Sequence, residues 1–333
     1  MSIATEVVRK HPGNPIITFR DVPWPCTMAY NPGCVRTAHG RYALAFRADE
    51  FPESMINAGQ REKLGVVPAR DYYQTIAMAF SDDGVDFDIH PAPVLKPLPD
   101  EEGRVYDPRL TTIEGVHYMT YATDPERGIM NGIARSTDLL TWERVHRTLP
   151  DNRNAVLFPE KVNGLFVRLD RPFARQYVVR RGFDMWIGYS PDLEFWGRHK
   201  LVLHHDDIPW GAIKVGPATP PLRTDEGWLA LFHGVQKREP DEYGWQLTYR
   251  AGVMLLDLED PSRIIGICPD PIMEPTEEYE NVGFRSTVLF PGALIPEADG
   301  TVTIYYGAAD QSVALATANI DDLLDLCGVR AHA

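Results

Sequence analysis

The chain of 333 residues has few cysteines and no long apolar run. Its four cysteines show no CxxC spacing, which argues against a zinc cluster and suits buried free thiols in a reducing compartment. No stretch approaches the roughly eighteen consecutive apolar residues of a membrane span, and the first residues lack the basic head and apolar run of a signal peptide. The sequence therefore predicts a cytoplasmic location and no membrane association.

Positive charge is also scarce. The chain has 33 Lys and Arg against 47 Asp and Glu, and its net charge is −14. Nucleic acids and anionic membranes bind basic surfaces, so neither is expected as a partner. Any anionic ligand must be bound by a local basic cluster. Hydrophobic residues make up 44% of the chain, enough for a substantial core, and we expect residues 1–333 to form a single domain.

The sequence contains a degenerate repeat. Ser81, Ser136 and Ser190, at spacings of 55 and 54 residues, each begin a turn with an acid two residues later and an aromatic residue six residues later. Weaker copies, "LDLEDPS" near Asp257 and "TANIDDLL" near Thr317, extend the series to five. Two strand-like runs precede each turn. Further upstream, a third segment carries a proline each time: Pro32, Pro108, Pro159, Pro217 and Pro291.

Five units of about sixty residues with four short strands each are typical of a β-propeller. Because proline tolerates only strand ends or bulges, the proline-bearing strands are expected to be innermost, with their prolines at the rim of the central channel. "NPIIT" (residues 14–18) is expected to complete the last blade. The predicted fold is all-β, a five-bladed β-propeller with a short C-terminal helix over "IDDLLDLCG". The alternative is a two-sheet sandwich with coincidental prolines.

Polar residues near the starts of the inner strands would face one another across the channel. Asp107 is the only acid on a proline-bearing strand, and an extended chain would point Asp107 and Arg109 to the same side. Four basic side chains from the third and fourth units could surround one anion: Arg153, Arg171, Lys214 and His233. Taken singly, each would more often be part of a salt bridge, and Asp107 before Pro108 would more often form a turn.

One acid beside a basic pocket suits a particular chemistry. An inverting glycosidase needs two carboxylates, one acid and one base that activates water. An enzyme that uses phosphate as its nucleophile can omit the base. Nine segments, in order from about Asn14 to Leu324, carry a resemblance to a family with this chemistry: "NPGCVR", "YALAFRAD", "SDDGVDF", "YDPRLT", "NAVLFPEKVNG", "LDRPF", "KVGPATPP", "FHGV" and "LFPGALI…TIYYGAAD".

With these segments the chain resembles the inverting β-mannoside phosphorylases of glycoside hydrolase family 130. The resemblance implies a propeller that cleaves a terminal β-mannosidic linkage, of the β-1,4 type, with inorganic phosphate. The products would be α-D-mannose 1-phosphate and a shortened acceptor sugar. It implies no metal and no cofactor, with phosphate as co-substrate and β-mannosides or mannooligosaccharides as partners. A homo-oligomer is compatible with it. The alternatives are a β-mannoside hydrolase of the same family and a non-catalytic sugar-binding propeller.

The resemblance also implies residue roles. The catalytic acid would be Asp107, with its proton passing through a hydroxyl of the bound sugar. Burial and phosphate would raise its pKa, and Arg109 would lower it. Phosphate would be bound by Arg153, Arg171, Lys214, His233, Tyr249 and Arg70. Mannose would be bound by Asn31, Arg47, Arg109 and Asp310. Many family members have Lys-Asp where this chain has Arg153 and Asn154, which makes this neighbourhood more cationic.

Overall fold

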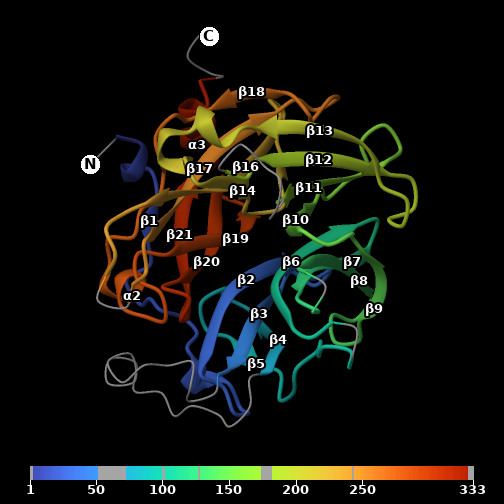
Figure 1. Ribbon diagram of the computed structural model, residues 1–333, viewed down its shortest axis with the longest axis vertical. Coiled ribbons are helices and arrows are strands. Elements are labelled where there is room, and N and C mark those ends of the chain that lie inside the picture. The colour runs from blue at the N-terminus through green and yellow to red at the C-terminus, as the bar shows by residue number, and fades with distance from the viewer. Residues whose placement is uncertain are drawn as a thin grey trace.

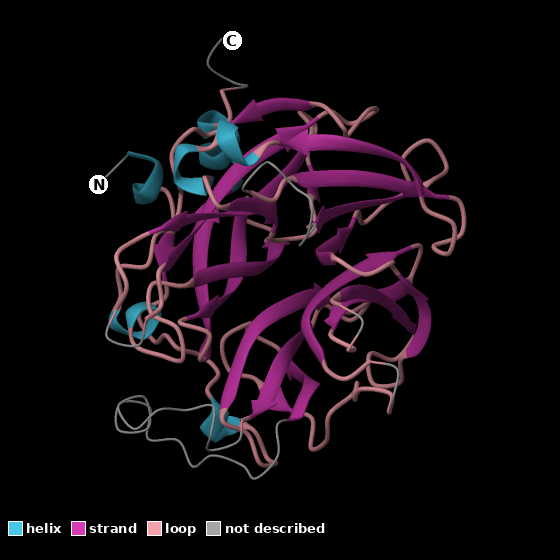
Figure 2. Ribbon diagram, viewed as in Figure 1, coloured by secondary structure: helices cyan, strands magenta, loops and turns pink. Residues whose placement is uncertain are grey.

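The computed structural model describes residues 3–51, 73–99, 102–126, 128–173, 182–241 and 244–328. These residues form five antiparallel sheets that follow one another around a ring in chain order (Figures 1 and 2). Each of the first four sheets has its strands in sequence order, the fourth with one additional short strand, and the fifth sheet is completed by an N-terminal strand. The prediction of an all-β, five-bladed propeller is confirmed. Arg70 lies outside the described residues.

The first blade consists of β2 (Met28–Arg36), β3 (Tyr42–Glu50), β4 (Tyr73–Ser81) and β5 (Asp88–Ile89). The second consists of β6 (Val105–Ile113), β7 (Val116–Thr123), β8 (Met130–Ser136) and β9 (Glu143–Arg147). The third consists of β10 (Asn152–Leu157), β11 (Phe166–Pro172), β12 (Met185–Ser190) and β13 (Gly197–Leu203). The fourth consists of β14 (Lys214–Pro217), β15 (Leu222–Arg223), β16 (Trp228–Lys237), β17 (Leu247–Leu256) and β18 (Ile264–Ile267).

The fifth blade joins the two ends of the described chain. It contains β19 (Leu289–Pro296), β20 (Thr301–Ala308), β21 (Ser312–Asn319) and the N-terminal strand β1 (Arg9–Lys10). The segment 14–18 also reaches this blade, through a bridge between Ile17 and Val313. The predicted closure is therefore confirmed, but the completing strand lies a few residues earlier than expected.

Helices are few and short among the described residues. The 3-10 turns are η1 (Ile3–Glu6), η2 (Phe19–Asp21), η4 (His205–Asp207) and η5 (Pro209–Gly211). The α-helices are α2 (Glu278–Asn281) and the predicted C-terminal helix, α3 (Ile320–Leu326). The side chain of Asn319 caps α3 by accepting a hydrogen bond from the backbone N–H of Asp321. In this part of the chain no helix is both long and apolar enough to cross a membrane.

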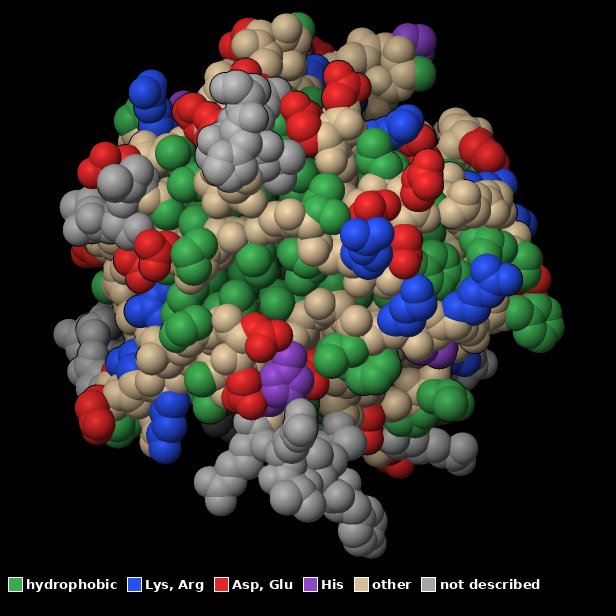
Figure 3. All heavy atoms as spheres, turned by 90° about the horizontal axis from the view of Figure 1, so that it is seen from above, with side chains coloured by type: hydrophobic (Ala, Val, Ile, Leu, Met, Phe, Trp, Pro, Cys, Tyr) green, Lys and Arg blue, Asp and Glu red, His purple; other side chains and the backbone are tan. Residues whose placement is uncertain are grey.

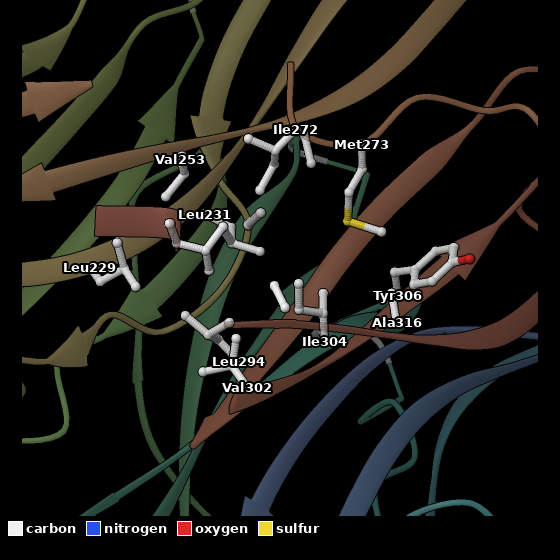
Figure 4. Close-up of a cluster of buried hydrophobic side chains, with 14 of the residues drawn as sticks. Leu229, Leu231, Val253, Ile272, Met273, Leu294, Val302, Ile304, Tyr306 and Ala316 are labelled. Carbon is white, nitrogen blue, oxygen red and sulfur yellow. The ribbon is translucent and has the colours of Figure 1, made fainter. Parts of the chain in front are cut away.

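The hydrophobic core is divided among the contacts between neighbouring blades. Five large clusters of buried side chains each combine residues from two adjacent blades, one cluster for every contact around the ring. Figure 4 shows the cluster in which Leu231 and Val253 of the fourth blade pack near Leu294 and Ile304 of the fifth. A two-sheet sandwich would have one core between its sheets. The arrangement of the clusters therefore matches a closed propeller.

The repeated turn has the same hydrogen bonds in three blades. The hydroxyl of Ser81 accepts a bond from the N–H of Gly84, and Asp83 Oδ1 accepts bonds from the N–H groups of Val85 and Asp86. The turns at Ser136 and Ser190 repeat this pattern. The serine and the acid are thus used to satisfy backbone donors, which explains their fixed spacing.

Candidate active site

A cavity of about 460 Å³ lies at the beginnings of the inner strands and is lined by residues from all five blades. Its charged lining residues are Arg47, Arg104, Asp107, Asp124, Arg153, Arg171, Lys214, Arg285 and Asp310. Cations therefore outnumber acids in the cavity, although the whole chain carries a net charge of −14. Acidic and basic side chains are interspersed on the face shown in Figure 3.

Four inner strands contain a β-bulge, and three of these bulges position polar side chains. The pairing register shifts in β2, β6 and β10, and the first extra residue of each bulge is Asn31, Asp107 or Asn154. All three have left-handed backbones, with φ of 49°, 55° and 61°, and all three line the cavity. Such a conformation costs a non-glycine residue about 1–3 kcal/mol and is concentrated at functional sites. Its recurrence in three successive blades marks this end of the channel as the candidate active site.

The bulge in β6 overturns one expectation. It breaks the alternation of the strand, so Asp107 and Arg109 do not share a side. Asp107 lines the cavity, whereas Arg109 is outside the lining and buried. The guanidinium of Arg109 donates to three backbone carbonyls, those of Pro108, Ala218 and Pro291. These bonds give Arg109 a role in joining blades, and its expected contact with mannose stays a prediction.

Asp107 is surrounded by donors from three other strands. Its Oδ1 accepts a bond from Asn31 Nδ2 at 2.8 Å and lies 3.3 Å from a terminal nitrogen of Arg47. Its Oδ2 is 2.9 Å from a terminal nitrogen of Arg153. Burial by itself would raise the pKa of Asp107, but Arg153 and Arg47, with the amide of Asn31, hold it well below its usual value. The carboxylate is therefore ionised at neutral pH, and Arg47 and Arg153 contribute more to this than Arg109 does.

Beside Asp107, Arg153, Arg171 and Lys214 form a group of cations in one wall of the cavity. Burial, followed by the charge of Arg153, lowers the pKa of Arg171 to about 10. Burial and the charges of Arg171 and Arg153 lower the pKa of Lys214 well below its usual value. The Nε atoms of both arginines are buried without a hydrogen-bond partner. This group is suited to a bound anion, which would satisfy the free donors and relieve the repulsion.

Tyr249 lies against this group, because Lys214 Nζ is 4.8 Å from the centre of its ring. His233 lies behind Arg171 and is fully buried outside the cavity lining. Its Nε2 accepts a bond of 2.7 Å from Arg171, and its Nδ1 is 3.2 Å from the carbonyl of Pro217. Burial, then the charges of Arg171 and Lys214, keep its pKa well below the usual value, so the ring is neutral. The structure therefore places His233 where it orients Arg171, and its expected contact with phosphate stays a prediction.

The other expected sugar-binding residues line the cavity. Asn31 and Arg47 lie beside Asp107, and Asp310 lies 3.4 Å from Arg285. Arg47 is itself held by buried Asp49, which also accepts bonds from Tyr30 and Gln74. These buried contacts fix the guanidinium of Arg47 in place.

Several lining residues were not predicted, among them Gln74, Trp245 and Phe284. The ring of Trp245 is stacked on Tyr249 at 6.3 Å, and the guanidinium of Arg285 lies 4.6 Å from the centre of the Trp245 ring. Trp245 and Phe284 lie between strands, outside the repeat that guided the prediction. Aromatic residues in the connections at this end of the propeller were the signal that could have identified them.

The described residues contain one cluster of metal-ligating type, formed by Asp184, His204 and His205. It lies outside the cavity lining, and Asp184 Oδ1 is 2.7 Å from His205 Nδ1. Within the cavity, Asp107, Asp124 and Asp310 each pair with an arginine. This lining suits an anion better than a metal cation.

Comparison with known proteins agrees with this site. Residues 69–329 match the model of glycoside hydrolase family 130, described as beta-1,4-mannooligosaccharide phosphorylase. A 1,2-beta-oligomannan phosphorylase of a Thermoanaerobacter species is 32% identical over 86% of this chain and 88% of its own. The beta-1,4-mannooligosaccharide phosphorylase of Ruminococcus albus is 30% identical over 98% of this chain and 92% of its own.

Among solved structures, the beta-1,2-mannobiose phosphorylase of Listeria innocua, in complex with beta-1,2-mannobiose, superposes with a TM-score of 0.82. It is 28% identical and covers 97% of this chain and 99% of its own. The family match extends over most of the sequence, and the relatives agree with it in length and fold. The chain belongs to glycoside hydrolase family 130.

Proposed function

We propose that this protein cleaves a terminal β-mannosidic linkage with inorganic phosphate and inverts the anomeric configuration. The products are α-D-mannose 1-phosphate and an acceptor sugar one unit shorter. One observation carries the proposal: Asp107, the one buried carboxylate among the described residues of the lining, shares a cavity with Arg171 and Lys214, beside buried guanidinium donors that lack a partner. The family and the phosphorylase relatives support the same reaction.

In the proposed reaction, Arg153, Arg171 and Lys214 hold phosphate for attack on the anomeric carbon, from the face opposite the leaving sugar. The bond between this carbon and the glycosidic oxygen breaks while the bond to a phosphate oxygen forms. Asp107 supplies the proton that the leaving oxygen receives, by way of a hydroxyl of the bound sugar. Asn31, Arg47 and Asp310 are proposed to bind the mannosyl unit.

Hydrolysis is the second candidate within the same cavity. It would require another carboxylate to activate water. The other acids of the lining, Asp124 and Asp310, are paired with Arg104 and Arg285. Phosphate needs no such base because it is already an anion. The cationic group of the cavity therefore favours phosphorolysis.

The linkage is proposed to be β-1,4. The description of the family model and the relative that matches 98% of the chain support this assignment. Other relatives are named for β-1,2 linkages, so both linkages belong in the test. We further propose that the enzyme acts in the cytoplasm with no cofactor besides its co-substrate.

The test is to incubate the protein with β-1,4-mannobiose, β-1,2-mannobiose or mannosyl-glucose, with and without phosphate. We expect mannose 1-phosphate to form from the β-1,4 substrates only when phosphate is present. Release of free mannose at the same rate without phosphate would identify a hydrolase. Binding of sugar without cleavage under any condition would identify a non-catalytic propeller.

Asp107→Asn is expected to keep the fold and lose nearly all turnover, because the amide cannot supply the proton. Loss of a general acid commonly costs about 10²–10⁴-fold in rate. Thermal melting and the circular dichroism spectrum show whether the variant is folded. Near-normal turnover by the folded variant would remove Asp107 from its proposed role.

A further inference from the structure

The acid of the proposed reaction must carry a proton, yet Asp107 is surrounded by Asn31, Arg47 and Arg153, donors that favour its carboxylate form. Resting on the proposed function, we propose that phosphate binding and protonation of Asp107 are linked through Arg153. The incoming anion takes the guanidinium of Arg153 as its partner, and Asp107, released from that ion pair, takes up a proton. Asp107 becomes an acid only when the nucleophile is in place.

The contacts of Asp107 identify Arg153 as the partner that phosphate can remove. The carboxylate is bound by Asn31 on β2, Arg47 on β3 and Arg153 on β10. The other titratable groups that interact with it are Tyr30 on β2, Tyr106 and Arg109 on its own strand, and Arg171 on β11. Arg47 is bound to Asp49 at 2.7 Å and approaches Asp107 only to 3.3 Å. The guanidinium of Arg109 donates its hydrogen bonds to backbone carbonyls. Arg153 makes the shorter ion pair, at 2.9 Å.

Arg153 also belongs to the cationic group. It lies directly opposite Arg171 in the pairing of β10 with β11. Like charges opposite each other on neighbouring strands are unfavourable, and an anion between them removes this cost. The Nε atom of Arg153 is buried without a hydrogen-bond partner. The side chain of Arg153 as a whole is 30% exposed, which makes it more accessible than Arg47, the other arginine paired with Asp107. The guanidinium therefore lies between the carboxylate and the anion that the cavity is suited to bind.

The electrostatic consequence has a definite sign. Without an anion, Arg153 and Arg47 outweigh burial and keep the pKa of Asp107 low. An anion that engages Arg153 weakens the larger of these two attractions and adds a negative charge nearby. Burial of Asp107 then favours the neutral form, so its pKa rises and a proton enters from solvent. The linkage is reciprocal, and anion binding must strengthen as the pH falls.

The proton is conserved over the reaction. Bound hydrogen phosphate attacks the anomeric carbon, and the proton of Asp107 ends on the leaving sugar hydroxyl. The product is first a mannosyl hydrogen phosphate, which loses its proton to solvent. Asp107 is left as a carboxylate and pairs again with Arg153. In the absence of phosphate the carboxylate has no proton to donate, which suppresses cleavage by water.

Sulfate is the probe for this linkage, because it has the shape and charge of phosphate and does not titrate near neutral pH. Calorimetric titration with sulfate in buffers of different ionisation enthalpy gives the number of protons taken up on binding. At mildly acidic pH we expect the wild-type protein to take up about one proton more per sulfate than Asp107→Asn. Because of that proton, the affinity of the wild type for sulfate should fall about tenfold for each unit by which the pH is raised. Equal proton uptake by the two proteins would overturn the proposal.

Lys214 and His233 could also gain protons from a bound anion, because the pKa of each lies well below its usual value. The comparison with Asp107→Asn subtracts their contribution. The difference infrared spectrum provides a direct readout: sulfate should produce a band of a protonated carboxyl group in the wild type and no such band in Asp107→Asn. Absence of the band from the wild type contradicts the proposal.

Arg153→Gln tests the residue that carries the linkage. This variant lacks the guanidinium whose capture by the anion would release Asp107, so the proton uptake assigned to Asp107 should disappear even at sulfate concentrations that saturate the weakened site. Undiminished uptake would exclude Arg153 from this role. The mannose 1-phosphate assay separates the two proposals, because phosphorolysis without linked proton uptake would leave the proposed function standing and remove the linkage alone.

Discussion

At the scale of single residues, the site contains side chains that line the cavity and further side chains that hold these in place. Asp49 fixes Arg47, and His233 fixes Arg171. Neither supporting residue lines the cavity. A hydrogen bond to a charged group contributes about 1.5–3 kcal/mol, enough to change affinity by tenfold or more.

His233 should therefore act on phosphate binding through Arg171. In His233→Leu the acceptor for Arg171 is lost, and we expect the KM for phosphate to rise about tenfold while the KM for the mannoside changes little. His233→Gln offers a side-chain oxygen to the guanidinium and should restore part of the effect. Steady-state kinetics with each substrate varied in turn provides the measurement, and equal changes in both KM values would show a general structural defect.

At the scale of elements, the inner strands approach one another so closely that glycine is required where they meet. A Cβ on Gly292 of β19 would lie 1.6 Å from the carbonyl oxygen of Pro32 on β2. A Cβ on Gly33 of β2 would lie 2.8 Å from the Cα of Arg109 on β6. These contacts bring the bulged strands together, and the bulges in turn aim Asn31 and Asp107 into the cavity.

Gly292→Ala should be strongly destabilising, because the backbone of β2 or β19 must move to admit the methyl group. We expect a loss of about 1–3 kcal/mol in the free energy of unfolding, the usual cost of overpacking, measured by chemical denaturation. Gly197→Ala is the matched control, since its added Cβ meets nothing within 4 Å. Similar losses in both variants would contradict the close contact of β19 with β2.

At the scale of the whole molecule, the ring is closed by a short N-terminal strand together with a buried ion pair. Lys10 of β1 lies 2.6 Å from Glu280 of α2, and the Glu280 side chain is fully buried. Tyr306 of β20 also donates to Glu280. The N-terminal segment is thereby attached to the last blade by side chains as well as by strand pairing.

Lys10→Met should destabilise the closed ring. Removing the cation leaves a buried carboxylate with fewer partners, and we expect a loss of about 2 kcal/mol in the free energy of unfolding. Lys161→Met is the control, because its ion pair with Glu114 lies at the surface and should contribute less than about 1 kcal/mol. Thermal and chemical denaturation give both values, and equal effects would show that the Lys10 pair does not support closure.

The amino-acid sequence by itself determined the number of blades, the order of strands and the ends of the inner strands. These features rest on local chemistry: the Ser and Asp of three turns bind nearby backbone N–H groups, and Pro32, Pro108 and Pro291 lie at bulges of inner strands. The same repeat predicted that Asp107, Arg153, Arg171 and Lys214 would face one cavity, and the structure brings them together.

The tertiary structure alone decided which way individual side chains point. A bulge turns Asp107 away from Arg109, and the packing of the fourth blade places His233 behind Arg171. It also decided the charge state of Asp107, because Arg47 and Arg153 come from strands distant in the sequence. Local patterns report the period of a strand, but a bulge of one residue or an ion pair between blades depends on contacts that form only when the ring closes.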